Sequence, residues 1–378
     1  SLSDVGSQLV AKMTTDGVAT ATLTSQVAGT AYVTATADSK YDTANVTFDP
    51  DLPYTVTVEA DPTHIPIGWF TSTIAATVED QYGNMVADGT EVTIATDLGS
   101  VGSTSVVKTT TDGVAHATLT SGLTIGTAHI TATSGSAVGN TQVVFTVGAP
   151  YTVTMESWPP TIEVGGNTAT ITATVTDIGG YAVADGTPVV FTTDLGSLGS
   201  DTVTKYTVNG VATAMLTSGL TPGVAHITAT ADSRLGTAIV KFAAGPPFDI
   251  VVVADPTYIP IGGATSLITA TVKDRYGNHV TNGTNVDFIT TLGAVSPSSA
   301  ATTDGIAVTT LTSGLMVGTA RVTAIAGPAE DWVDVVFTIG PPSYIVVVAN
   351  PTSIGLNGQT SNIEATVRDV GGNNVADG

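Results

Sequence analysis

Hydrophobic and polar residues alternate along most of this chain in short stretches. Between residues 73 and 78, for example, Ile74, Ala76 and Val78 alternate with threonine and alanine. A period of two residues is typical of antiparallel strands with one buried face, and no stretch shows the period of a helix. In one representative part of the chain, the alternation predicts strands at 54–58, 73–78, 90–95, 114–120, 127–133 and 142–147.

This set of strands repeats about every 97 residues. An aspartate that precedes a glycine-containing turn recurs at Asp80, Asp177, Asp274 and Asp369, at spacings of 97, 97 and 95 residues. A fixed period of this size indicates tandem domains. Seven or so short strands in each repeat are typical of an immunoglobulin-like sandwich. The expected fold class is therefore all-β, with tandem immunoglobulin-like β-sandwiches in an elongated array.

The repeat register also predicts the domain boundaries. The expected segments are the C-terminal half of a domain at 1–52, complete domains at 53–149, 150–246 and 247–342, and the N-terminal half of a domain at 343–378. Proline stands at each start, as in Pro53, Pro150 and Pro247. Because proline fixes its own φ angle and restricts the preceding residue, short linkers of this kind predict a semi-rigid rod of roughly 35–40 Å per domain.

The two half-domains leave two alternatives open. Half a sandwich exposes its inward face to water, which costs roughly 25 cal/mol per Å² of apolar surface. Either the chain is a slice of a longer array, or the two halves complete each other between neighbouring molecules by strand complementation.

One stretch of the chain resembles a known family. The string from Val183 to Leu198, with its Ala-Asp-Gly-Thr-Pro turn, is followed by Gly-Val-Ala-Thr-Ala-Met-Leu-Thr-Ser at 210–218. Together they resemble the bacterial immunoglobulin-like group one domain of invasin and intimin-like adhesins, and the likeness extends over essentially the whole chain. This resemblance implies stalk repeats of a large extracellular, cell-surface protein, in which a separate tip domain is carried away from the cell.

Composition excludes several classes of function. The formal net charge is −22, only 11% of residues are charged, and there is no cysteine. Such a chain would be repelled by nucleic acid and by anionic membranes, and it has no thiol for catalysis or zinc binding. No apolar run reaches the ~20 residues that a membrane-spanning helix needs, so no membrane insertion is expected in this region.

Candidate chemistry is sparse. The aspartates Asp80, Asp177 and Asp274 are weak calcium candidates, because calcium prefers clustered oxygen ligands, but Asx turns explain the same residues without a metal. His129 and His226 share a repeat position with Arg321 and are interpreted as ordinary surface residues.

Two further features of the sequence bear on modification and chemistry. Asn45 and Asn282 begin glycosylation sequons. No catalytic motif is present, so no catalytic residue, enzymatic activity or cofactor is expected.

Three functions remain as hypotheses. The first is a filament, stalk or sheath whose partners are neighbouring copies or adjoining repeats. The second is an adhesin whose repeats bind a ligand on a host or neighbouring cell. The third is a spacer that tethers an enzyme domain outside this region. An apolar patch repeated at a fixed loop position would favour the second. The conspicuous exposed candidate, Trp69-Phe70, occurs once and is replaced by Asn167-Thr168 or Ala264-Thr265 elsewhere. The sequence therefore favours the first.

Overall fold

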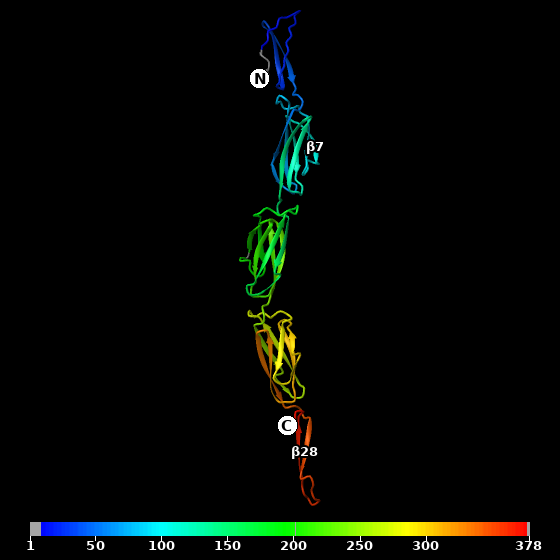
Figure 1. The fold of residues 1–378 in the computed structure, drawn as a ribbon, viewed down its shortest axis with the longest axis vertical. Coiled ribbons are helices and arrows are strands. Elements are labelled where there is room, and N and C mark those ends of the chain that lie inside the picture. Colours follow the sequence, from blue (N-terminus) through cyan, green and yellow to red (C-terminus); the bar gives the residue numbers. More distant parts are fainter. Residues whose placement is uncertain (1–8, 201, 376–378) are drawn as a thin grey trace.

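The molecule is a row of β-sandwiches joined end to end (Figure 1). The computed structural model describes residues 9–200 and 202–375, and within them every regular element is a strand. Three complete sandwiches occupy the middle of the rod, with a two-stranded sheet at either end. The remaining residues of the expected end segments, 1–8 and 376–378, lie outside the described part.

The first complete domain contains two packed sheets. One has the order β3-β5-β8 and the other β4-β10-β9-β6-β7, and all neighbours are antiparallel except β4 and β10. The strands are β3 (Thr55–Asp61), β4 (His64–Pro66), β5 (Thr71–Glu79), β6 (Glu91–Thr96), β7 (Ser105–Thr109), β8 (Val114–Thr120), β9 (Gly126–Ser134) and β10 (Ala137–Thr146).

The second domain repeats this topology as β11-β13-β16 and β12-β18-β17-β14-β15. Its strands are β11 (Thr152–Trp158), β12 (Thr161–Glu163), β13 (Thr168–Thr176), β14 (Pro188–Thr193), β15 (Thr202–Tyr206), β16 (Val211–Thr217), β17 (Gly223–Ala231) and β18 (Arg234–Ala243).

The third domain has the sheets β19-β21-β25-β23 and β20-β27-β26-β22-β24, so its first sheet gains a short edge strand. Its strands are β19 (Asp249–Asp255), β20 (Tyr258–Pro260), β21 (Thr265–Lys273), β22 (Asn285–Thr290), β23 (Ala294–Ser296), β24 (Ser299–Ala301), β25 (Ile306–Thr312), β26 (Gly318–Ala326) and β27 (Ala329–Thr338).

The end segments each hold one antiparallel strand pair. At one end β1 (Gly29–Ala37) pairs with β2 (Lys40–Phe48), and at the other β28 (Tyr344–Asn350) pairs with β29 (Asn362–Arg368). Side chains that would face a core, such as Val33 and Ile363, are exposed here.

Each complete domain has its own core, built from alternate residues of both sheets. Ile74, Ala76 and Val78 are fully buried in the first domain, as the alternation predicts, and Leu119 packs in the same cluster. The small alanines allow the sheets to approach closely.

Each core also contains a buried aromatic ring that the sequence analysis missed. These rings belong to Phe145, Phe242 and Phe337 on the last strand of each domain. Burying such a side chain contributes roughly 1.5–3 kcal/mol relative to leaving it exposed. The signal was present in the sequence, because these phenylalanines follow the same repeat spacing.

Two strands differ from the prediction. The first strand of each domain is followed by a separate short strand, such as β4, which pairs in parallel in the opposite sheet. The edge strand β7 was not predicted, because its side chains are largely exposed on both faces and alternation is weak.

The register around the aromatic pair also needs correction. The backbone N–H groups of Ser121, Ser218 and Ser313 donate to the carbonyl oxygens of Phe70, Asn167 and Ala264. Phe70 therefore corresponds to Asn167 and Ala264. The sequence comparison placed Trp69 there instead, and was wrong by one residue.

Candidate functional site: the domain junctions

The recurrent aspartates lie at the junctions, directly after the second long strand of each repeat. Asp80, Asp177, Asp274 and Asp369 are at most 2% exposed. The Oδ1 atom of Asp274 accepts hydrogen bonds from the backbone N–H groups of Tyr276 (2.8 Å) and Asn278 (2.9 Å). This is an Asx turn, in which the side chain holds the loop that follows it.

The other carboxylate oxygen reaches across the junction to the linker. The Oδ2 atoms accept the N–H groups of Asp51 (to Asp80, 3.0 Å), Gly148 (to Asp177, 2.8 Å), Gly245 (to Asp274, 3.0 Å) and Gly340 (to Asp369, 3.1 Å). Each aspartate therefore ties the chain that leaves one repeat to the first loop of the next. We call this aspartate, its Asx turn and the linker N–H the junction clasp.

Hydrogen bonds at three of the clasps stabilise the ionised form of the aspartate. Burial raises the pKa of Asp274, but the Asn278 side chain and the N–H groups of Gly245, Asn278 and Tyr276 stabilise the anion more strongly. The pKa of Asp274 therefore lies below its ordinary value, and the same balance lowers the pKa of Asp80 and Asp369. Hydrogen bonds to an ionised acceptor are stronger than neutral ones.

Apolar side chains close the junction beside the clasp. Tyr181 of the second domain packs against the core of the first. The backbone of Gly179 lies so close to the first domain that a Cβ atom there would be 2.7 Å from Ile67 Cδ1. At the last junction, a Cβ atom on Gly371 would likewise be 2.7 Å from Ile261 Cδ1.

The junction between the second and third domains adds two side-chain contacts, and the second of them recurs at the junction before the first complete domain, where Asn84 Nδ2 donates to the carbonyl oxygen of Gln26 at 2.9 Å. The ring of Tyr276 lies against Gly165 of the preceding domain. Asn278 Nδ2 donates to the carbonyl oxygen of Leu220, also across the junction, at 2.8 Å. Polar and apolar contacts together make the three junctions that follow the complete domains packed interfaces.

The comparisons with known proteins agree with this architecture. A family model described as Invasin, domain 3, matches residues 53–154 and 248–338, which is just over half of the chain. The chain belongs to the invasin domain 3 family. The resemblance to invasin and intimin-like repeats that the sequence indicates is thereby confirmed.

Three solved structures are among those similar to this chain. Invasin, titled a bacterial integrin-binding protein, is 23% identical with a TM-score of 0.50, over 78% of this chain and 62% of the invasin chain. The adhesin FdeC of Escherichia coli is 20% identical with a TM-score of 0.42, over 78% of this chain and 100% of its own. InvD of Yersinia pseudotuberculosis is 20% identical with a TM-score of 0.38, over 75% of this chain and 97% of its own.

The invasin match confirms the predicted all-β, immunoglobulin-like fold class. This chain spans less than two thirds of the invasin structure that it matches. No curated protein matches the chain. Within the residues described, no helix is long and apolar enough to cross a membrane.

The three aspartates considered as calcium ligands lie far apart along the invasin domain 3 repeats. Asp80, Asp177 and Asp274 each belong to a different junction, where their oxygens face N–H donors. Across residues 9–200 and 202–375, no three side chains of His, Asp or Glu gather into a group that could hold a metal ion.

The histidines and the sequons have ordinary surroundings. His129 and His226 are exposed and pair through Nδ1 with Asp97 and Asp194, each at 2.8 Å. Asn45 lies on exposed β2, whereas Asn282 is in an exposed turn where its Oδ1 accepts the N–H of Asp304 at 2.8 Å.

Trp69 and Phe70 lie beside the junction between the first and second complete domains, and their side chains are 61% and 51% exposed. The backbone of Trp69 is left-handed, with φ of 69°, where the other two domains have Gly166 and Gly263. A bulky residue in this region of φ is strained. The neighbouring Gly68 contacts Ile178 of the second domain.

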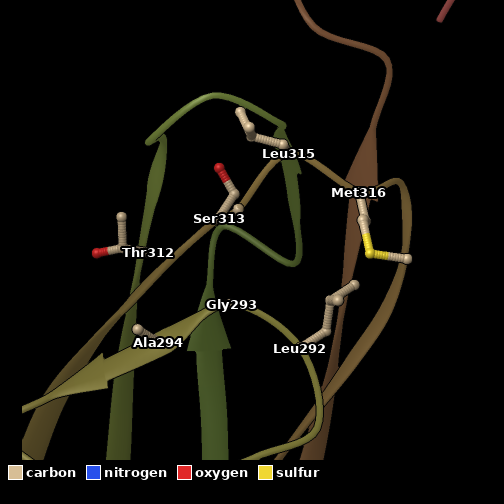
Figure 2. A pocket seen from close by; sticks show the side chains of 8 residues that line it. Leu292, Gly293, Ala294, Thr312, Ser313, Leu315 and Met316 are labelled. Carbon is tan, nitrogen blue, oxygen red and sulfur yellow. The ribbon is translucent and has the colours of Figure 1, made fainter. Parts of the chain in front are cut away.

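A shallow hollow of about 390 Å³ lies at the far end of the third domain. Figure 2 shows the side chains of Leu292 and Met316 turned toward each other there, with Leu315 above them. The lining is mostly aliphatic and includes no titratable side chain, so the hollow offers no group for acid–base chemistry.

Proposed function

We propose that this chain is the repeat region of an extracellular cell-surface filament, stalk or sheath, and that its role is to supply length and stiffness without catalysis. The observation that carries the proposal is the junction clasp. It recurs at every change of repeat along the rod, with the same donor and acceptor atoms.

The clasp supports stiffness for a physical reason. A linker alone would let adjacent domains swing, whereas a buried carboxylate that bonds both the linker and its own loop restricts their relative orientation. Removing one partner of such a charged hydrogen bond costs about 1–3 kcal/mol. The cell-surface location is supported by the invasin family membership and by the adhesins among the similar structures.

Stiffness can be measured directly because the chain has no cysteine of its own. Spin labels can be attached to Thr213→Cys in the second domain and Thr319→Cys in the third, since both positions are exposed. Double electron–electron resonance would then give the distribution of distances across the junction between these domains. We expect a narrow distribution in the labelled parent and a broader one, by roughly a factor of two, after Asp274→Ala.

Asp185→Ala is the matched control. Asp185 also accepts a backbone N–H, from Asn209 at 2.6 Å, but both residues lie within the second domain. This variant should leave the distribution narrow. An equally narrow distribution after Asp274→Ala, or a broad one in the parent, would contradict a clasped, stiff stalk.

A further inference from the structure

The third domain differs from the other two on the outer face of its five-stranded sheet. Three neighbouring strands, β22, β26 and β27, form adjacent parts of this face. In one row across them, Ile289 is opposite Thr323, which is opposite Trp332. Ile289 and Trp332 are 57% and 52% exposed, so large apolar side chains face solvent in a single row.

Charged residues border this row on both sides. In the next row, Asp287 is opposite Ile325, which is opposite Glu330, so two exposed carboxylates flank an aliphatic side chain. On the other side, Arg321 is opposite Asp334. We call these residues the tryptophan platform: Asp287, Ile289, Arg321, Thr323, Ile325, Glu330, Trp332 and Asp334.

The platform is held in place before any partner arrives. Arg321 Nε and Nη2 donate to the two carboxylate oxygens of Asp334 at 2.9 and 3.1 Å. The guanidinium carbon lies 5.2 Å from the centre of the Trp332 ring, within the range of a cation–π contact. A tryptophan fixed in this way loses little side-chain entropy on binding, and Trp and Arg are frequent at the centres of interfaces.

The same positions in the other domains lack this combination. Glu330 and Trp332 correspond to Leu235 and Thr237 in the second domain, and Asp287 and Ile289 to Val190 and Thr192. The paired carboxylates and the tryptophan therefore belong to the third domain and are not required by the shared fold.

Charge indicates the kind of occupant. Arg321 is already neutralised by Asp334, which leaves Asp287 and Glu330 as the uncompensated charges of the platform; Asp287 accepts a neutral amide N–H from Asn285. Opposite edges of three adjacent strands are separated by roughly 10 Å, so one cationic side chain lying over Ile325 can reach both carboxylates. A second copy of this chain is disfavoured, because two copies with a formal net charge of −22 repel each other.

We propose that the tryptophan platform is a docking site for a basic, extended polypeptide segment in which a lysine or arginine lies two residues from an apolar residue, so that both side chains project from the same side of the segment. The cationic side chain lies between Asp287 and Glu330, with its aliphatic stem on Ile325. The apolar neighbour packs on Trp332 and Ile289. This inference goes beyond the stalk function and does not depend on it.

The first test uses calorimetric titration of the 378-residue chain with the nine-residue lysine–leucine peptide Lys-Gly-Leu-Gly-Lys-Gly-Leu-Gly-Lys, which projects lysine and leucine from the same side when it is extended. We expect measurable binding, and a loss of at least about tenfold in affinity after Trp332→Thr, which installs the residue of the second domain. Trp158→Thr is the control, because Trp158 is 77% exposed on a strand of a different domain. It should change affinity by less than about twofold.

Two further measurements distinguish binding at the tryptophan platform from a general attraction of basic peptides to an acidic protein. Asp287→Val with Glu330→Leu should also weaken binding about tenfold, since it removes the two uncompensated carboxylates. A peptide of lysine and glycine, with the same charge but no apolar side chain, should bind much more weakly than the lysine–leucine peptide.

Three outcomes would overturn the proposal. The first is equal binding of the parent and Trp332→Thr, and the second is equal binding of the two peptides. The third is binding of a neutral oligosaccharide such as maltoheptaose at Trp332 without binding of the basic peptide, which would assign the platform to sugars. All substitutions are at exposed positions, and an unchanged thermal transition would show that the variants fold.

Discussion

In each complete domain, one loop glycine packs against the buried phenylalanine of the last strand. The pairs are Gly99 with Phe145, Gly196 with Phe242 and Gly293 with Phe337. In the second domain, Gly196 has φ of 79°, which is left-handed backbone. A Cβ atom there would lie 2.6 Å from the carbonyl oxygen of Thr217 and 2.8 Å from Phe242 Cζ. This position therefore requires glycine for two reasons. The backbone is left-handed, and there is no room for a Cβ atom between Thr217 and Phe242.

This arrangement predicts the cost of adding a methyl group. Gly196→Ala should destabilise the second domain by about 2–4 kcal/mol, from roughly 1–2 kcal/mol of backbone strain and the rest from overpacking against Phe242. Gly199→Ala is the matched control, since its φ is also positive, at 95°, but no atom lies within 4 Å of its Cβ position. It should cost about 1 kcal/mol. Hydrogen exchange of β13 amides gives both values, and equal costs would contradict the packing argument.

At this scale the sequence predicted inward residues better than junction residues. Ile74, Ala76 and Val78 follow from alternation alone, because strand geometry is local. The aspartates were noticed through their spacing, but their partners were not predicted. Gly148 lies 29 residues before Asp177, and the two meet because one domain packs on the next.

Strands differ in how many neighbouring strands pair with them and in how far their inward side chains are buried. In the second domain, β13 is paired on both sides by β11 and β16, and its inward residues are buried. By contrast, within residues 9–200 and 202–375, β1 and β2 form a sheet of two strands, and one residue of β1, Ala31, is buried. An isolated strand pair is marginally stable in water, whereas a central strand opens with the whole domain.

The amides of β13 should therefore exchange roughly a thousandfold more slowly than those of β1 and β2 in the 378-residue chain, because they open only with the domain. Mass spectrometry of peptic fragments after deuterium labelling measures this difference. The strand pair of β28 and β29 serves as an internal comparison, and it should behave like β1 and β2. Similar slow exchange in all three places would contradict the prediction.

Strand positions were predicted to within a few residues, but the distribution of strands between sheets was not. The short strand β4 joins the sheet opposite β3, and this depends on its register with β10, about 80 residues later. A local pattern contains no such information. The edge strand β7 was missed for a related reason, since an exposed edge imposes little alternation.

At the scale of the whole molecule, the domains follow one another along a single line (Figure 1). The predicted elongated array agrees with this shape, because repeated linkers with repeated contacts give repeated orientations. The properties of the rod then depend on the weakest junction. Because the pKa of Asp274 is lowered at the junction between the second and third domains, we expect this junction to respond to acid.

The direction of the pKa shift sets the pH range of this sensitivity. The pKa of Asp274 is lowered in the folded chain, so its contribution is fully present above the ordinary value of 3.8 and is lost as pH falls through the lower, folded pKa. The distance distribution between labels at 213 and 319 should stay narrow from pH 7 to pH 4 and broaden only below 3.8.

Asp274→Ala provides the reference for this titration. Its distribution should be broad at neutral pH and should change little on acidification, while circular dichroism reports whether the sandwiches remain folded. Broadening of the parent between pH 6 and pH 5 would show that another group controls the junction.

The clasp also dictates an order of events during synthesis. A ribosome releases Gly148 well before Asp177, and the two residues are 29 positions apart. Until Asp177 has been synthesised and its loop has formed, the backbone N–H of Gly148 hydrogen-bonds to water. The hydrogen bond that aligns two neighbouring domains therefore forms only after the loop of the later domain is in place.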